Sequence, residues 1–489
     1  MRIVVIGAGL GGLSAACHLV GRGHEVTVIE REDRPGGRAG QIEERGYRID
    51  TGPTVLTMLD LLGSVFNAAG AELTDHLTVR AVDPMYRAVY DDGSVLHVRA
   101  GRDAMTEEIR QFAGAHDAAA FGRFADWLRE LYEAELPNFI ARDFNSPFDL
   151  MRSPAAALRL VRLGAFKKLA PTVASYFDDE RVQRIFSFQS MYAGLSPMEA
   201  LAVYSVITYM DTIEGVYFPE GGMHAIGSGL AAAAQKAGVE FQYRVSAERI
   251  VRRPSGVVAG VRCTNGETID ADAVVCNVDL PVAYRQLLGT EPPLVARRGR
   301  YSPSCAVWVA GVQGKPPADA AHHNIHFGGQ WERAFDALLR DGTRMPDPSI
   351  LVTIPTYGDP TLAPEGRSVI YALEPTPNLD GRIDWTRDRG RIRADLVNRV
   401  ESLGYPVLAE VERFTDPLDW EAQGMERGTP FALAHLFRQT GPFRPAIAPK
   451  KFPGVFFTGS GTRPGVGVPI VLVSGQLTAE RVDEWASAR

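Results

Sequence analysis

The feature that most constrains the fold is a glycine-spaced turn that directly follows a short apolar strand near residue 1. Residues 3–6 read Ile-Val-Val-Ile, and Gly7, Gly9 and Gly12 follow at the spacing G-x-G-x-x-G. In such a unit the first glycine makes the tight turn, the second lets backbone N–H groups approach a pyrophosphate, and the third lets the helix pack against the strand. The pattern predicts a Rossmann-type unit that binds a dinucleotide at a helix N-terminus.

An acidic residue in register with these glycines narrows the choice of dinucleotide. We expect a second strand over residues 25–29, and it ends at Glu30, 18 positions after Gly12. A carboxylate at that point accepts ribose hydroxyls and repels a 2′-phosphate, so NADP is disfavoured while NAD and FAD remain. The alternative is a glycine-rich turn without a ligand.

Composition excludes several other classes of protein. A chain of 489 residues predicts two or three domains, and a net charge of −7 argues against a nucleic-acid partner. The four cysteines form no C-x-x-C pair, which favours a reducing cytoplasm over a disulfide framework. The first apolar run is too short for a signal peptide, and no run is long enough for a transmembrane helix.

Two blocks after the first unit carry a resemblance to a known family. Residues 31–38 read R-E-D-R-P-G-G-R, and residues 47–54 read Y-R-I-D-T-G-P-T. This order resembles the flavin family of amine oxidases, protoporphyrinogen oxidases and carotenoid desaturases. The resemblance implies that the cofactor is FAD and that a basic side chain pairs with its phosphates. It assigns the following residues of these blocks to FAD: Arg31, Gly37, Arg38, Gly52, Pro53 and Thr54.

The C-terminal segment narrows the resemblance further. Residues 458–469 read T-G-S-G-T-R-P-G-V-G-V-P, which resembles the signature of bacterial-type phytoene desaturases. The resemblance places Gly459, Val468 and Pro469 at the cofactor and the backbone of Val245 at its adenine. The apolar helix that we expect over residues 470–481 can stabilise reduced flavin with its N-terminus. No cysteine follows Cys305, so we expect non-covalent FAD.

These motifs predict an interleaved α/β fold of mixed α+β character. A Rossmann-type FAD-binding domain is expected in three segments, 1–80, 215–290 and 446–489. A helical, membrane-facing region is expected at 81–214 and a substrate-binding domain at 291–445. Residues 191–195 and a helix over 198–210 are candidates for an apolar substrate tunnel, with ordinary core packing as the alternative.

A basic stretch suggests contact with a bilayer. Residues 151–177 hold five basic and no acidic side chains, interleaved with apolar ones. Such a segment is typical of a membrane-surface helix, although a solvated basic face has the same composition. We therefore expect a cytoplasmic protein that associates peripherally with the membrane through Arg159, Arg162, Lys167 and Lys168.

The resemblance implies desaturation of a lipophilic carotenoid precursor, most simply phytoene toward lycopene. Flavin N5 takes a hydride, the adjacent carbon loses a proton, and oxygen or a membrane quinone reoxidises the flavin. Asp149 and Arg152, at i and i+3, are tentative catalytic residues, and the alternative is a helix-stabilising ion pair.

Other functions stay open at this point. The same motifs fit a C30 or late-stage desaturase, a carotenoid isomerase or a saturase. An amine oxidase-type enzyme or a non-catalytic flavin-binding protein fits less well, since the cofactor motifs are intact and the C-terminal motif holds Pro464 and Pro469 rather than aromatic residues.

Overall fold

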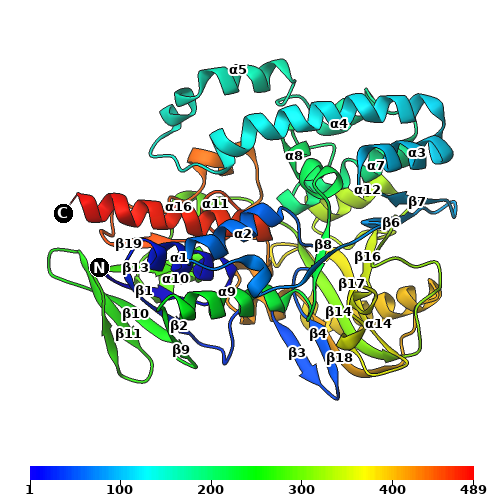
Figure 1. The fold of residues 1–489 in the computed structure, drawn as a ribbon. Coiled ribbons are helices and arrows are strands. Elements are labelled where there is room, and N and C mark those ends of the chain that lie inside the picture. The colour runs from blue at the N-terminus through cyan, green and yellow to red at the C-terminus, as the bar shows by residue number, and fades with distance from the viewer. Residues whose placement is uncertain (489) are drawn as a thin grey trace.

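The computed structural model describes residues 1–488, apart from the side chain of Met151. Its first layer is a parallel sheet whose strands come from the beginning, middle and end of the chain (Figure 1). The strand order is β19 (Val455–Phe457), β13 (Ala273–Cys276), β1 (Arg2–Ile6), β2 (Glu25–Glu30) and β9 (Glu240–Tyr243). All four pairings are parallel, as expected of a Rossmann-type sheet, and they confirm the predicted α/β class.

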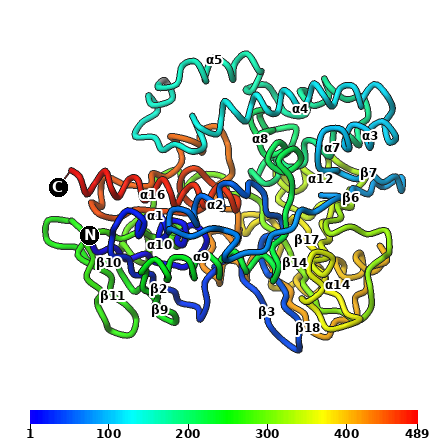
Figure 2. The backbone as a smooth tube through the Cα atoms, in the orientation of Figure 1, coloured from blue at the N-terminus to red at the C-terminus, as the bar shows by residue number. Residues whose placement is uncertain are grey.

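Helices α1 (Leu10–Gly21), α2 (Leu59–Ala68), α9 (His224–Lys236) and α16 (Val468–Ser487) lie beside this sheet. Helices α1 and α16 pack closely, and the Ser14 hydroxyl donates to the Leu472 carbonyl at 2.7 Å. A Cβ atom added to Gly475 would lie 2.5 Å from the Ser14 side chain, so only glycine permits this approach. Both ends of the chain lie on the same side of the molecule (Figure 2).

A three-stranded antiparallel sheet accompanies the Rossmann sheet. It consists of β10 (Ala247–Arg252), β11 (Val258–Cys263) and β12 (Thr268–Asp270). Two further small pairs are β3 (Gln41–Glu44) with β4 (Tyr47–Asp50), and β5 (Val79–Ala81) with β8 (Tyr217–Pro219).

The second large layer is a seven-stranded sheet. Its order is β18 (Ala409–Thr415), β14 (Ser304–Gln313), β17 (Arg367–Thr376), β16 (Ile350–Thr353), β15 (His323–His326), β6 (Tyr86–Val89) and β7 (Val95–Val98). Helix α14 (Trp385–Ser402) buries Leu396 and Val400 against this sheet. Shorter helices connect the strands: α10 (Leu280–Gln286), α11 (Leu294–Arg298), α12 (Trp331–Asp336), α13 (Pro355–Gly358) and α15 (Pro417–Ala422).

A helical layer lies over one side of the two sheets (Figure 1). It contains α3 (Arg102–Ala113), α4 (Ala115–Glu135), α5 (Pro154–Arg162), α6 (Leu169–Ala174), α7 (Glu180–Ile185) and α8 (Ser205–Thr208). Two π-helical turns interrupt it, at Leu136–Ile140 and Tyr209–Ile213. Within the described residues, no helix combines the length and apolar character needed to span a bilayer. The domain boundaries given above remain a prediction.

The continuous helix expected over residues 198–210 is wrong. The structure has a short 3-10 helix at Ala202–Tyr204, then α8, then the second π-helical turn. The backbone N–H of Ala202 donates to the Lys167 carbonyl at 2.8 Å, and that of Val203 donates to the Ala165 carbonyl at 2.7 Å. These long-range bonds replace the intrahelical bonds that the apolar spacing predicted.

Candidate active site

One cavity of about 1600 Å³ runs from the Rossmann sheet to the wall formed by the second sheet and the helical layer. All of the predicted cofactor residues except Gly12 line it. Gly12 instead lies under the glycine turn, where an added Cβ atom would come within 2.1 Å of the Gly7 carbonyl oxygen. The cofactor motifs near the two ends of the sequence therefore line the same cavity.

The first glycine turn can bind an anion through backbone N–H groups at the start of helix α1. Helix α1 begins after Gly9 without a side-chain cap and without an acidic residue in its first turn, so its first N–H groups are available. An added Cβ atom on Gly9 would lie 2.7 Å from Nδ2 of Asn277, and one on Gly37 would lie 3.0 Å from Cα of Gly9. The backbone is thus close-packed around the position that a pyrophosphate needs.

Glu30 is fixed at the end of β2 by backbone donors. Its Oε2 accepts the Ala8 N–H at 2.6 Å, and its Oε1 accepts the Glu32 N–H at 3.0 Å. The carboxylate is buried yet reaches the cavity. Beside it, the Val245 N–H donates to the Glu30 carbonyl at 2.9 Å, so Val245 and Glu30 lie at the same part of the pocket.

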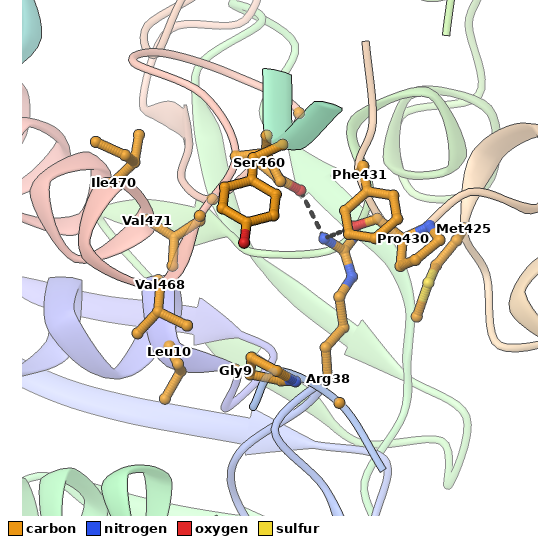
Figure 3. A pocket seen from close by; sticks show the side chains of 18 of the residues that line it. Gly9, Leu10, Arg38, Met425, Pro430, Phe431, Ser460, Val468, Ile470 and Val471 are labelled. Carbon is orange, nitrogen blue, oxygen red and sulfur yellow. Dashed lines mark hydrogen bonds between the residues drawn. The ribbon is translucent and has the colours of Figure 1, made fainter. Parts of the chain in front are cut away.

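Arg38 supplies the positive charge at the centre of the cofactor region. Its Nη1 donates to the Pro430 carbonyl and to the Ser460 hydroxyl, both at 2.8 Å, and Figure 3 shows both bonds. Its Nη2 lies 3.5 Å from Oδ2 of Asp279, whose two oxygens are buried and accept no hydrogen bond among the described residues. Burial raises the pKa of Asp279 to about 6, against the opposing effect of Arg38.

The C-terminal motif completes the pocket from the other side. Val468 and Val471 of α16 lie across the pocket from Phe431 in Figure 3. Helix α16 begins after Gly467, which has φ of 119°, and no side chain caps it. Its first N–H groups can therefore face a negative charge.

Arg463 anchors this motif to the rest of the protein. Its Nη1 lies 3.0 Å from Oδ1 of Asp143, and its Nε donates to the Arg444 carbonyl at 3.2 Å. Oδ2 of Asp143 also accepts from Nε of Arg481 at 2.6 Å. A buried carboxylate therefore joins the motif to helix α16.

These residues fit FAD. A glycine cradle, a free helix N-terminus, a half-buried arginine and a carboxylate placed to bind ribose occur in the order that a flavin dinucleotide requires. The orphaned oxygens of Asp279 beside Arg38 are also consistent with a missing polar ligand.

The remainder of the cavity is mostly apolar. Both candidate segments contribute to it: Met191, Tyr192 and Ala193 of the first, and Leu201, Val203, Tyr204, Val206, Ile207 and Met210 of the second, whereas Leu195 and Met198 do not. Further apolar and aromatic lining residues are Phe139, Ile140, Phe188, Phe327, Trp331, Leu373 and Phe431.

The cavity reaches the surface next to α5. Phe166, Phe437 and Phe443 line the cavity and are also exposed. Phe148, Leu158 and Val161, which precede Phe166 in the chain, are also exposed large apolar side chains. The turn that holds Phe148 contacts the turn that holds Phe443. We call these six residues the apolar rim: Phe148, Leu158, Val161, Phe166, Phe437 and Phe443.

The predicted membrane-binding cations differ in their surroundings. Arg162 and Lys167 are exposed and make no ion pair within the described residues. Arg159 pairs with Glu133 at 3.1 Å, and Nζ of Lys168 donates to the Glu199 carbonyl at 2.8 Å. Two of the four cations are thus free to meet an anionic surface.

Asp149 and Arg152 form the expected ion pair, at 3.0 Å between Oδ1 and Nε. Oδ2 of Asp149 also accepts the N–H groups of Asn145 and Ser146, at 2.6 and 3.2 Å, in a capping box. These backbone bonds first, and then Arg152, hold the pKa of Asp149 below its usual range. Neither side chain lines the cavity. Their catalytic role remains a prediction, and the contacts favour the structural alternative.

Several residues at the site were not singled out from the sequence. Ser460 and Arg463 fall inside the quoted C-terminal motif, so their neighbours could have indicated them. Glu135 and His435 line the cavity but belong to no recognisable motif, and Tyr204 lies in the candidate tunnel segment 198–210 without having been named individually. Only the packing of distant segments brings these three together.

Comparison with known proteins agrees with this geometry. The model of the flavin containing amine oxidoreductase family matches residues 10–483. A phytoene dehydrogenase of Streptomyces griseus is 46% identical, over 98% of this chain and 95% of that protein. A zeta-carotene-forming phytoene desaturase of Myxococcus xanthus is 36% identical, over 100% of this chain and 95% of that protein.

Solved structures share the fold at low sequence identity. An oxidoreductase from Methanosarcina mazei has a TM-score of 0.66 at 16% identity, covering 98% of this chain and 100% of that one. A putrescine oxidase bound to putrescine has a TM-score of 0.60 at 16% identity, covering 99% of both chains. With FAD as its cofactor, the chain belongs to the flavin-containing amine oxidoreductase family and, within it, to the phytoene and carotenoid desaturases.

Proposed function

We propose that this protein desaturates phytoene toward lycopene. The observation that carries the proposal is the single cavity that joins the cofactor residues to a mostly apolar wall and then to the apolar rim. A hydrocarbon has no polar handle, so burial of apolar area, at about 25 cal/mol per Å², must supply its binding energy. The names of the relatives with which the chain aligns over nearly its full length support the same substrate class.

The residues of this chain hold and orient the reactants. Gly9, Glu30 and Arg38 fix the dinucleotide, and the α16 N-terminus faces the position where negative charge develops. FAD, when bound, supplies the hydride acceptor. The aromatic and aliphatic wall excludes water and holds the polyene chain along the cavity.

Membrane association is part of the proposal. A carotenoid precursor resides in the bilayer, and three residues of the apolar rim, Phe166, Phe437 and Phe443, line the cavity while being exposed at the surface. The unpaired cations Arg162 and Lys167 lie on the same segment as three residues of the rim. An amphipathic surface of this kind supports peripheral binding to anionic lipid, from which substrate enters the cavity directly. Oxygen or a membrane quinone would then accept the electrons.

Anaerobic incubation of the holoenzyme with phytoene in vesicles tests the proposal. We expect loss of oxidised flavin absorbance and formation of a product with a longer conjugated system. Phytoene-accumulating cells that express the chain should accumulate coloured carotenoids, and cells expressing a FAD-free Gly9→Val variant should not. A flavin spectrum unchanged by phytoene but bleached by another carotenoid would assign the protein to another member of the carotenoid-acting group.

A further inference from the structure

Glu135 is a buried carboxyl in the cavity wall that lacks a hydrogen-bond partner. It is the last residue of α4, its exposed fraction is 6%, and it lines the cavity. Its Oε1 is fully buried and accepts no hydrogen bond from the described residues. Because leaving a buried carboxyl unpaired is costly, native proteins seldom keep such a group without a ligand or a reaction that uses it.

The backbone around Glu135 places it at the cofactor end of the cavity. Helix α4 passes directly into the π-helical turn Leu136–Ile140, and such turns occur frequently at functional sites. Leu136, Ile140 and Ile470 pack against the same buried cluster, and Ile470 belongs to the first turn of α16. The residue that follows Glu135 therefore shares a buried cluster with the first turn of α16, the helix end proposed to face the flavin.

A second series of contacts links Glu135 to the C-terminal flavin motif. Burial first, and then the Glu135 carboxyl, raise the pKa of Tyr204, so the two side chains are electrostatic neighbours. The Tyr204 hydroxyl donates to the His435 carbonyl, and Nε2 of His435 accepts the Val466 N–H at 3.5 Å. Val466 lies inside the C-terminal flavin motif.

Other acidic groups on the cavity wall already have partners. Glu30 binds backbone N–H groups and Asp279 faces Arg38. Asp211, the other buried carboxyl of the apolar part, accepts from the Thr212 hydroxyl at 2.8 Å and from Tyr86 and Gln189 at longer distances. Among the buried acids of this described wall, Glu135 is the one with neither a hydrogen bond nor an ion pair, since Asp279 has Arg38 beside it.

We propose that Glu135 is the proton acceptor in desaturation, a role that rests on the function proposed above. The ionised Glu135 carboxylate takes a proton from one substrate carbon, and the C–H bond of the adjacent carbon would lose its hydride to the bound cofactor. The electron pair of the C–H bond that loses the proton forms the new double bond. The hydride and its two electrons would be taken up by FAD when it is bound, while Glu135 becomes a carboxylic acid and releases its proton to solvent before the next turnover.

The surroundings of Glu135 set the pH dependence of this step. Burial raises the pKa of Glu135 well above its usual range. The ionised form that accepts a proton therefore becomes more abundant as pH rises, and it is a stronger base than an exposed carboxylate. Flavin reduction should consequently accelerate with pH until Glu135 is fully ionised.

Stopped-flow reduction of the holoenzyme by phytoene in vesicles, measured anaerobically over a range of pH, tests this role. Loss of a positioned base typically slows a proton transfer by about 10²–10⁴-fold, so Glu135→Gln should slow flavin reduction by at least about 100-fold and remove its rise with pH. Glu135→Asp should restore part of the rate of flavin reduction and part of its rise with pH. Glu130→Gln, the same change at an exposed position of α4, should behave as the parent does.

A spectroscopic readout separates this role from a structural one. In the substrate-free holoenzyme, infrared difference spectra between low and high pH should contain a carboxylic-acid C=O band that Glu135→Gln lacks and Glu130→Gln keeps. Glu135→Gln should still bind FAD stoichiometrically.

Three outcomes would overturn the role. The first is flavin reduction in Glu135→Gln at the parent rate with the same pH profile, and the second is loss of the pH dependence in Asp211→Asn instead. The third is a parent holoenzyme in which the infrared band of Glu135 titrates but phytoene does not reduce the flavin. That result would overturn the proposed substrate, and with it the role of Glu135 in its desaturation.

Discussion

Removing two apolar side chains from the rim should weaken binding to vesicles by about two orders of magnitude. Phe148 is 83% exposed and Val161 is 60% exposed, so both have most of their apolar area available to lipid. Full burial of such side chains is worth about 1.5–3 kcal/mol each, which gives about 2 kcal/mol for Phe148 and about 1 kcal/mol for Val161 after scaling by exposure. The sum of about 3 kcal/mol corresponds to about a 100-fold change in partition coefficient.

Co-sedimentation of Phe148→Ser/Val161→Ser with vesicles of increasing lipid concentration measures that change. The matched control is Leu294→Ser/Leu408→Ser, because these side chains are 57% and 64% exposed and lie outside the apolar rim. The rim variant should retain its FAD content and thermal stability, since exposed side chains contribute little to folding. Equal partition of parent and rim variant, or an equal loss in the control, would refute the assignment of this surface to the membrane.

Four further predictions concern the cofactor site and its supports. Gly52→Ala should purify with little FAD, measured by the ratio of flavin to protein absorbance, because a Cβ atom there would lie 1.8 Å from the Arg38 carbonyl oxygen. Asp143→Asn should lower the free energy of unfolding in urea by about 3–5 kcal/mol, because it leaves buried cations without their carboxylate. Asp149→Asn should cost about 1 kcal/mol of stability through its capping bonds while keeping turnover per bound flavin. The pKa of Glu135 is higher in the folded than in the unfolded state, so the folded state binds more protons. The stability of the parent, measured by thermal scans, should therefore fall relative to that of Glu135→Gln as pH rises above about 4.3.

The cofactor half of the site could be predicted because its information is local. The spacing of Gly7, Gly9 and Gly12 encodes a turn, and Glu30 lies at the end of the adjacent strand. Each motif specifies its own backbone geometry, and the Rossmann pairing then determines where the motifs meet. The first two strands lie within one residue of their expected bounds, whereas helix α16 runs six residues past its expected end at residue 481.

The substrate half depends on contacts that no short window contains. The helix expected over 198–210 breaks because Ala202 and Val203 bond to residues 165–167 instead. In the sequence Glu135 cannot be distinguished from the other acidic residues of an amphipathic helix, and only the fold buries it in the cavity wall near Tyr204. The apolar rim likewise joins Phe148 to Phe443, from turns almost 300 positions apart in the chain.

The strand order of the Rossmann sheet has a consequence for biosynthesis. Strand β19 and helix α16 complete a pocket that begins at β1, so residues 455–487 must be synthesised before the pocket can close. At roughly 5–20 residues per second, roughly 20–90 s separate translation of β1 from that of β19. During this time α1 lacks the helix that covers it, and its apolar face is available to chaperones. We therefore expect FAD to bind only after residues 455–487 have been synthesised, and chains truncated before β19 should purify without cofactor.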